Sequence, residues 1–275
     1  MTTPSIDLDA YFQRIGHDGD RAPTLETLRA LQLRHAQTIP YETVNTLLGL
    51  PVHLDPSSLQ RKLIQDRRGG YCYEQNLLLQ DVLRALGFAT TGLEARVLWN
   101  APEGETRART HMLMRVDLEE TPYIVDIGFG ARCPTAPLRL VADVEQDTPH
   151  GSFRLIRAKD DFILECELRD GWAPLYRFDL QAQERIDYEV ANWYVSAHPR
   201  SSFIGQLLVA LAEPGRRHTL RGNELATHYP DRETDRRLLT TPAEIHEALE
   251  TIFEINLDGL PNLDTALARL CEPGD

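Results

Sequence analysis

The stretch from Arg68 to Asn76, Arg-Gly-Gly-Tyr-Cys-Tyr-Glu-Gln-Asn, places Cys72 directly after a glycine pair. An apolar run at roughly helical spacing follows it: Leu77, Leu78, Val82, Leu83 and Leu86. This spacing predicts a helix that begins at or near Cys72. A helix N-terminus carries partial positive charge and favours a thiolate, so Cys72 is a candidate nucleophile. The competing interpretation is a small buried apolar residue, the usual fate of a free cysteine. We expect the two glycines to keep the approach to the sulfur free of side chains.

A cysteine nucleophile needs a base to take its proton and a third group to orient that base. His111 lies in a strand-like run, and Asp126 lies in the apolar run of residues 123–129. A buried carboxylate needs a partner. The midpoint between His111 and Asp126 falls beside the turn predicted at residues 119–122, so we expect a hairpin that brings them together. Taken singly, His111 could be a core histidine and Asp126 a turn-capping or ion-paired residue; together with Cys72 they fit one mechanism.

The elements that must position these residues change type along the chain. Residues 1–87 predict helices, with Thr24 and Asp55-Pro56 as helix starts. Strands are expected over residues 90–98, 110–118, 123–129, 152–157, 162–168 and 175–178. Beyond residue 180 we expect a helix over 181–194, paired strands over 202–212 and 216–227, a helix capped by Thr241 and a short helix over 263–270. An α+β protein of three subdomains packed as one unit is the simplest arrangement.

Composition narrows the function classes. The 275 residues carry a net charge of −13, with 42% hydrophobic and 26% charged residues, which suits a soluble globular protein. The charge argues against nucleic acid or an anionic membrane as the main partner. No apolar run is long enough to span a bilayer, and the N-terminus lacks the regions of a signal peptide. The four scattered cysteines form no CxxC pair and no histidine pair has zinc spacing, so we expect no metal site and a reducing cytoplasm.

Several stretches resemble the signature sequences of the arylamine N-acetyltransferases, and the length suits the bacterial members of that family. The resemblance rests on the cysteine stretch at residues 68–76, on Thr110-His111 and on Val125-Asp126-Ile127-Gly128-Phe129-Gly130. Ile39-Pro40-Tyr41-Glu42, Asn192-Trp193-Tyr194 and Ser201-Ser202-Phe203 are similar to further family stretches. Two departures, Tyr41 for the commoner phenylalanine and Thr43 for asparagine, concern substrate preference and leave the reaction class unaffected.

The resemblance implies a fold and a reaction. The fold is a papain-like or transglutaminase-like core with an N-terminal helical bundle (1–87), a central β-barrel (88–180) and a C-terminal α/β lid that follows a linking helix (181–275). The triad is Cys72, His111 and Asp126. The reaction is a ping-pong transfer, in which acetyl-CoA acetylates Cys72 and the acetyl group then passes to the nitrogen of an arylamine, arylhydrazine or N-hydroxyarylamine. We expect a cytoplasmic monomer or homodimer of xenobiotic metabolism.

The resemblance also nominates binding residues. Thr110, Phe129 and Gly130 match positions near the CoA cleft, although Gly130 also fits a tight strand exit. Tyr41 and Phe203 match positions that line the acceptor pocket in relatives, with aromatic core packing as the competing interpretation. Arg68 and Glu42 are expected to form a buried ion pair that supports the cysteine loop.

Three other functions remain open. An amide synthase could use the same triad to release a carrier-bound polyketide chain as a macrolactam. The order Cys, His, Asp also suits a transglutaminase-like enzyme, whereas a papain-type peptidase would place its histidine much further downstream. A non-catalytic binding module that retains the fold would leave Cys72 with the alkylation rate of an ordinary thiol.

Overall fold

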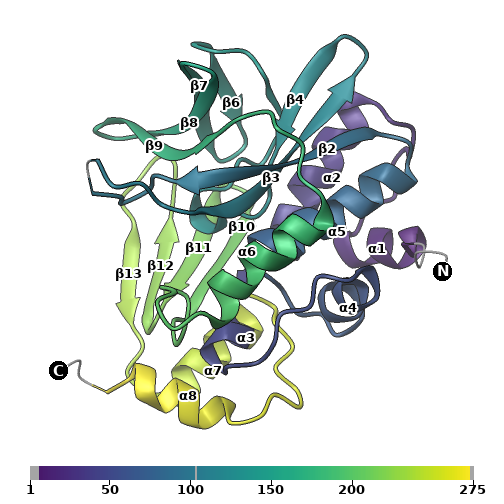
Figure 1. Cartoon of the computed structure of the whole chain (residues 1–275). Helices are drawn as coiled ribbons and strands as arrows, with labels where there is room; N and C mark the ends of the chain where they lie inside the picture. Colours follow the sequence, from purple (N-terminus) through teal and green to yellow (C-terminus); the bar gives the residue numbers. More distant parts are fainter. Residues whose placement is uncertain (1–5, 103, 273–275) are drawn as a thin grey trace.

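The structure, a computed structural model, describes residues 6–102 and 104–272 (Figure 1). Helices dominate up to residue 85: α1 (Leu8–Ile15), α2 (Leu25–Thr38), α3 (Val44–Leu47), α4 (Pro56–Gln60), a π-helical turn (Arg61–Gln65) and α5 (Cys72–Ala85). Thr24 caps α2 by accepting a hydrogen bond from the Thr27 N–H at 3.2 Å. Asp55 caps α4 in the same way, with proline at the first helical position. Both predicted helix starts are therefore confirmed.

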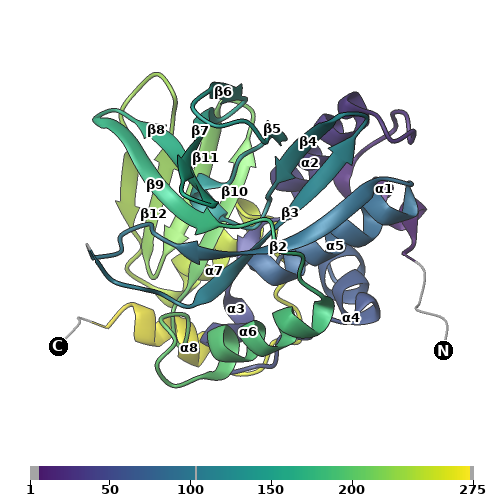
Figure 2. The same cartoon turned by 45° about the horizontal axis from the view of Figure 1, so that its top comes forward.

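The described residues between 89 and 178 form an antiparallel sheet in the order β5-β4-β3-β2-β9-β8-β7-β6. Its strands are β2 (Ala89–Val97), β3 (Arg109–Leu118), β4 (Thr121–Val125), β5 (Leu138–Arg139), β6 (Glu145–Thr148), β7 (Gly151–Ala158), β8 (Asp161–Leu168) and β9 (Gly171–Phe178). Figure 2 shows how the sheet curls. The Gln146 side chain on β6 bonds both backbone groups of Arg139 on β5, at 2.7 and 3.0 Å, and so ties the two edge strands together. The sheet is thus barrel-like, and the predicted α+β class is confirmed.

A second antiparallel sheet lies in the C-terminal part, in the order β1-β10-β11-β12-β13. Its strands are β1 (Tyr41–Glu42), β10 (Leu208–Glu213), β11 (Arg216–Arg221), β12 (Glu224–His228) and β13 (Asp235–Leu238), and α7 (Pro242–Thr251) and α8 (Leu263–Leu270) pack against it. Because β1 comes from the helical part, the first and last parts of the chain share one sheet. The division at residues 87 and 180 stays a prediction.

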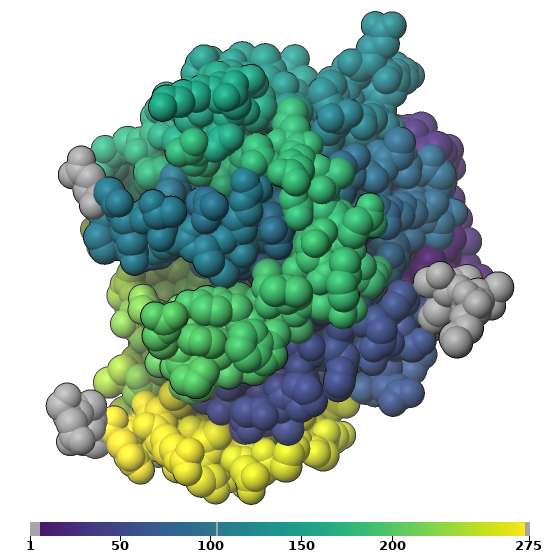
Figure 3. All heavy atoms as spheres, in the orientation of Figure 1, coloured from purple at the N-terminus to yellow at the C-terminus, as the bar shows by residue number. Residues whose placement is uncertain are grey.

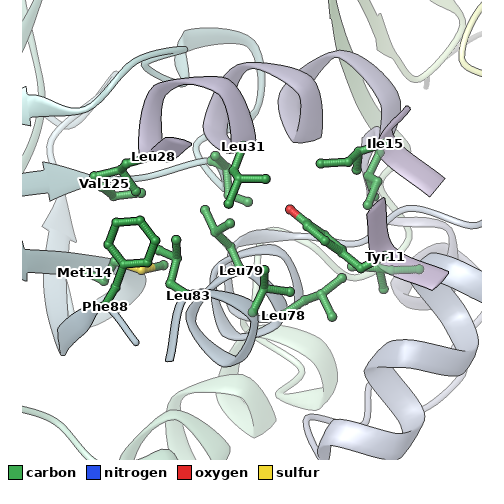
Figure 4. Close-up of a cluster of buried hydrophobic side chains, with 14 of the residues drawn as sticks. Tyr11, Ile15, Leu28, Leu31, Leu78, Leu79, Leu83, Phe88, Met114 and Val125 are labelled. Carbon is green, nitrogen blue, oxygen red and sulfur yellow. The ribbon is translucent and has the colours of Figure 1, made fainter. Parts of the chain in front are cut away.

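Helix α5 lies in the main hydrophobic core and carries Cys72 at its first position. Its apolar side packs against α1, α2, β3 and β4 (Figure 4). The labelled side chains are all 4% exposed or less: Tyr11, Ile15, Leu28, Leu31, Leu78, Leu79, Leu83, Phe88, Met114 and Val125. Burial of each contributes about 1.5–3 kcal/mol. This packing fixes the helix on which the cysteine sits.

Helix α6 (Arg185–Ala197) links the two sheets and crosses the molecule in front of α5 (Figure 1), where Figure 3 shows it as part of a green band. Its inner side buries Tyr188, Asn192 and Val195, and Tyr188 and Val195 belong to the same cluster as Cys72. A Cβ atom at Gly92 would lie 2.3 Å from the Tyr188 hydroxyl oxygen, so only glycine lets α6 pack this closely on β2.

Some predicted elements were wrong in extent. The strand expected over 123–129 ends at Val125, because the Asn76 side chain bonds the backbone groups of Met112 and Ile127, which the ladder would otherwise pair. The strand expected over 202–212 begins only at Leu208 and continues to Glu213. The strand expected over 216–227 is two strands, separated by a turn in which Gly222 has a φ of 59°. The helix expected over 181–194 begins at Arg185 and continues to Ala197.

Candidate active site

Cys72 is the first residue of α5 and is 4% exposed. The backbone N–H of Tyr71, the N-cap residue, donates to the Glu74 carboxylate at 3.1 Å, and Lys62 Nζ lies 2.7 Å from the same side chain. Backbone N–H groups of the first turn have no acceptor within the helix. The sulfur therefore lies at the positive end of a well-anchored helix, as predicted.

The glycine pair lets the loop pack closely on two neighbouring segments, and its expected effect on the approach to the sulfur stays a prediction. A Cβ atom at Gly69 would lie 2.0 Å from the Pro40 carbonyl oxygen, and one at Gly70 would lie 2.8 Å from Glu74. Both glycines therefore let the loop pack against the segment before β1 and against the first turn of α5. The Gln75 side chain reinforces this packing, because its Nε2 donates to the carbonyls of Pro40 at 2.7 Å and Gly70 at 3.1 Å.

The predicted ion pair between Arg68 and Glu42 is confirmed. The Arg68 Nη2 atom lies 2.6 Å from Glu42 Oε1 and 3.0 Å from Asn45 Oδ1. The other oxygen of Glu42 accepts from the Val44 N–H at 2.6 Å. Burial raises the pKa of Glu42, but Arg68, Lys62 and this backbone bond lower it, and the net shift is downward. The pair joins the cysteine loop to β1 and α3.

His111 and Asp126 meet as predicted. His111 Nε2 lies 2.7 Å from Asp126 Oδ2, and the two residues are 3% and 1% exposed. The hairpin turn at Glu119 and Glu120 lies within the predicted residues 119–122, and the register pairs Met114 with Val125. His111 and Asp126 are consequently diagonal neighbours, and Asp126 lies just beyond the end of β4.

Thr110 sits at an irregularity that aims its backbone at the sulfur. The register between β2 and β3 shifts after the pair Ala95–His111, which leaves Thr110 without a strand partner. Such a β-bulge redirects the local backbone. The Cys72 Sγ atom lies 3.8 Å from the Thr110 carbonyl oxygen. The bulge therefore brings β3 and the start of α5 into contact next to His111.

The charges of the pair follow from its surroundings. Burial alone lowers the pKa of His111, but the charge of Asp126, its hydrogen bond and the contact with Cys72 raise that pKa to about 10. Burial raises the pKa of Asp126, while His111, the Gly128 N–H and Asn76 lower it, and the net shift is downward. At neutral pH the pair therefore consists of an imidazolium and a carboxylate.

Three residues around the triad were not assigned a role from the sequence. Asn76 and the Gly128 N–H donate to Asp126 Oδ1, at 3.1 and 2.8 Å. A Cβ atom at Gly128 would lie 2.5 Å from the Cys72 Cα atom, so Gly128 permits contact between this loop and α5. The buried Tyr176 ring lies 4.9 Å from the His111 ring. The only sequence signal was the place of Asn76, four residues after Cys72 and therefore on the same helix face.

The nominated binding residues lie around the triad. The Phe129 ring is 4.9 Å from the His111 ring. Gly130 has a φ of 61°, and a Cβ atom there would lie 3.5 Å from the Tyr41 ring. Tyr41 and Phe203 pack at the edge of the cluster that contains Cys72. Their assignments to CoA or to the acceptor stay predictions.

One small hollow lies beside these residues and a larger one lies elsewhere. One of about 20 Å³, lined by Tyr41, Gly130 and Arg217 among others, is large enough for a single water. The other, of about 380 Å³, lies between the start of α2 and the β3–β4 turn, and its lining includes no triad residue. Among the described residues, no cluster of three or more His, Cys, Asp or Glu side chains could hold a metal ion. No helix in that part of the chain is long and apolar enough to cross a membrane.

Comparisons with known proteins give the family. A family model described as N-acetyltransferase matches residues 24–261. The arylamine N-acetyltransferase of Mycolicibacterium smegmatis is 41% identical over 272 residues, covering 98% of each chain. The Escherichia coli K12 enzyme of the same name is 39% identical over 252 residues, covering 91% of this chain and 89% of its own. The Mycobacterium marinum arylamine N-acetyltransferase, solved in complex with CoA, has a TM-score of 0.93 at 37% identity, covering 97% of this chain and 100% of that one.

This chain therefore belongs to the arylamine N-acetyltransferase family and is an acetyltransferase. The family resemblance predicted from the sequence is confirmed.

Proposed function

We propose that this acetyltransferase moves an acetyl group from acetyl-CoA to the nitrogen of an arylamine, arylhydrazine or N-hydroxyarylamine, through an acetyl-cysteine on Cys72. The observation that carries the proposal is the arrangement of three buried groups: a cysteine at a helix N-terminus, beside the Thr110 backbone, and next along that strand a histidine that bonds a carboxylate. The names of the relatives and the CoA complex of one of them support the substrate classes.

In the first half-reaction the Cys72 sulfur, as a thiolate paired with the His111 imidazolium, attacks the thioester carbonyl carbon. A new C–S bond forms and the bond to the CoA sulfur breaks, and His111 returns a proton to the departing thiolate. Asp126 holds the His111 ring and stabilises its charged form. The Cys72 backbone N–H, at the first position of α5, supplies a donor for the negative charge that develops on the carbonyl oxygen.

In the second half-reaction the acceptor nitrogen attacks the carbonyl carbon of acetyl-Cys72. His111 takes the proton that the nitrogen loses, the C–N bond forms, and the Cys72 thiolate leaves. The free thiolate and imidazolium are then restored, so atoms and charge balance over the cycle. The acetyl group must stay on the sulfur between the two steps, which the 4% exposure of Cys72 favours by limiting access of water.

The binding assignments belong to the same proposal. Thr110, Phe129 and Gly130 contact the pantetheine end of CoA, and this is supported by the places of Thr110 beside Cys72 and of Phe129 beside His111, with Gly130 next along the chain. Tyr41 and Phe203 contact the acceptor ring, supported by their packing at the edge of the Cys72 cluster. We assign the protein to the cytoplasm as a monomer or homodimer that requires no metal.

An acceptor panel tests the proposal. The purified chain is incubated with acetyl-CoA and with a hydrazine, a plain aniline or a hydroxyl-bearing arylamine, and release of the CoA thiol is followed. We expect acceptor-dependent release that Cys72→Ala and Cys72→Ser abolish while both variants keep the wild-type melting temperature. Release at the wild-type rate in both variants would overturn the proposal. No release with any acceptor would favour a carrier-bound acyl donor instead.

A further inference from the structure

The Asn76 side chain replaces a missing step of the β3–β4 ladder. The last backbone pair before the ladder stops is Met114 with Val125, so the same register would pair Leu113 with Asp126 and then Met112 with Ile127. Asn76 Nδ2 donates to the Met112 carbonyl at 2.7 Å, and the Ile127 N–H donates to Asn76 Oδ1 at 3.1 Å. The amide thus satisfies both backbone groups and holds the two strands apart where Asp126 leaves β4.

The same amide orients the carboxylate. Asn76 Nδ2 also donates to Asp126 Oδ1 at 3.1 Å, next to the Gly128 N–H at 2.8 Å. Both donors engage one oxygen, which leaves Oδ2 for His111 at 2.7 Å. The amide cannot be reversed, because its nitrogen faces two acceptors and its oxygen faces a donor. Asn76 is fully buried, so no water competes for these bonds.

We propose that Asn76 is a positioning residue that couples the nucleophile to the carboxylate of the triad. It lies one turn after Cys72 on α5, so a rigid helix sets the distance between the sulfur and the group that holds Asp126. Its bond to Asp126 favours the charged carboxylate, and the charged carboxylate favours the imidazolium that stabilises the thiolate. Asn76 acts through Asp126 and His111 and does not touch the reacting atoms.

The other titratable groups that influence this carboxylate do not replace the amide. Burial raises the pKa of Cys133 to about 12 and that of Tyr176 well above its ordinary value, so both are neutral at physiological pH. Tyr41 is held neutral in the same way, by burial first and then by the nearby acidic groups. The charge of Asp126 therefore depends on His111, Asn76 and the Gly128 N–H.

The test compares two buried amides on one helix. Asn76→Ala removes the bond to Asp126 together with the bonds to Met112 and Ile127, whereas Gln80→Ala removes an amide one turn further on whose Nε2 has no hydrogen-bond partner within the described residues. The readout is the pH dependence of Cys72 alkylation by iodoacetamide, together with the rate of acetylation by acetyl-CoA. For Asn76→Ala we expect alkylation to reach its half-maximal rate at a higher pH and acetylation to slow by about 10- to 100-fold, the size carried by one hydrogen bond to a charged group. Gln80→Ala should match the wild type in both.

This inference rests on the proposed function, and acetylation of the wild-type chain distinguishes failure of the proposed function from failure of the inference. A wild-type chain that acetyl-CoA does not acetylate contradicts the proposed function, whereas equal pH profiles for wild type and a folded Asn76→Ala contradict the role of Asn76 alone. Asn76→Asp has the same shape, but it places a carboxylate oxygen, an acceptor, against the two acceptors that the amide nitrogen bonds. Its half-maximal alkylation should therefore also occur at a higher pH. If both variants fail to fold while Gln80→Ala folds, Asn76 serves the fold and the positioning role is wrong.

Discussion

Gly128 offers the sharpest structural prediction. In Gly128→Ala the new methyl carbon would lie 2.5 Å from the Cys72 Cα atom and 2.7 Å from Asn76 Nδ2. The φ of Gly128 lies outside the left-handed region, so alanine is penalised only by these contacts. Ordinary contact begins at 3.4 Å. The loop and the start of α5 must therefore separate by about 1 Å, and a misplacement of that size at a reacting group lowers rates by on the order of 100-fold.

The assay is kcat/KM for acetyl-CoA with one fixed arylamine, measured beside thermal unfolding. We expect Gly128→Ala to lose about 100-fold, equivalent to about 2.7 kcal/mol, and to lose about 1–3 kcal/mol of stability through overpacking. Gly222→Ala is the control, because Gly222 has a φ of 59° and no atom within 4 Å of the added carbon. It should lose about 1 kcal/mol of stability and keep its kcat/KM. A folded Gly128→Ala with wild-type kcat/KM would refute the reasoning.

Three further outcomes follow from the same contacts. The folded-state pKa of His111 is raised from 6.5 to about 10, so its contribution to stability is fully present below pH 6.5 and is lost as the pH rises from 6.5 to about 10. In urea unfolding, Asp126→Asn should reduce this decline of the free energy of unfolding with pH. The same decline in the variant and the wild type would contradict the charged pair. Arg68→Ala leaves the buried Glu42 with only Lys62, 3.7 Å away, as a cationic partner and should lower the free energy of unfolding by about 3 kcal/mol, whereas loss of the exposed Arg236–Glu224 pair should lower it by less than about 1 kcal/mol; equal effects would argue against burial as the cause. Gly69→Ala places a carbon 2.0 Å from a backbone oxygen and should prevent accumulation of folded protein; a wild-type melting temperature would show that the loop yields.

The sequence predicted the parts of the site that depend on local signals. The spacing after Cys72 predicted the helix, and the apolar surroundings of Asp126 predicted a buried carboxylate with a partner. The observed turn at Glu119 and Glu120 lies within the predicted residues 119–122, but the prediction did not fix the register, which makes His111 and Asp126 diagonal neighbours. Because any of several neighbouring polar residues could form the turn, the sequence predicts the hairpin but not the register of its two strands.

The sequence could not show features in which a side chain takes the hydrogen-bonding place of a backbone group. Asn76 terminates β4 from another element, so the strand pattern up to Phe129 contained no sign of its end. The β-bulge at Thr110 has no residue signature of its own. Short strands such as β5 and β13 are too brief to carry a period. The close packing of the glycine pair against Pro40 and Glu74 depends on the tertiary structure and has no signal in the sequence.

The central claim is that the acetyl group rests on Cys72 between the two half-reactions. Intact-protein and peptide mass spectrometry after brief exposure to acetyl-CoA, without acceptor, tests it directly. We predict one added acetyl group on the peptide that contains Cys72, its removal within one turnover when an arylamine is added, and no adduct in Cys72→Ser. Arylamine acetylation that proceeds while Cys72 stays unmodified, or in Cys72→Ser at the wild-type rate, would contradict the account.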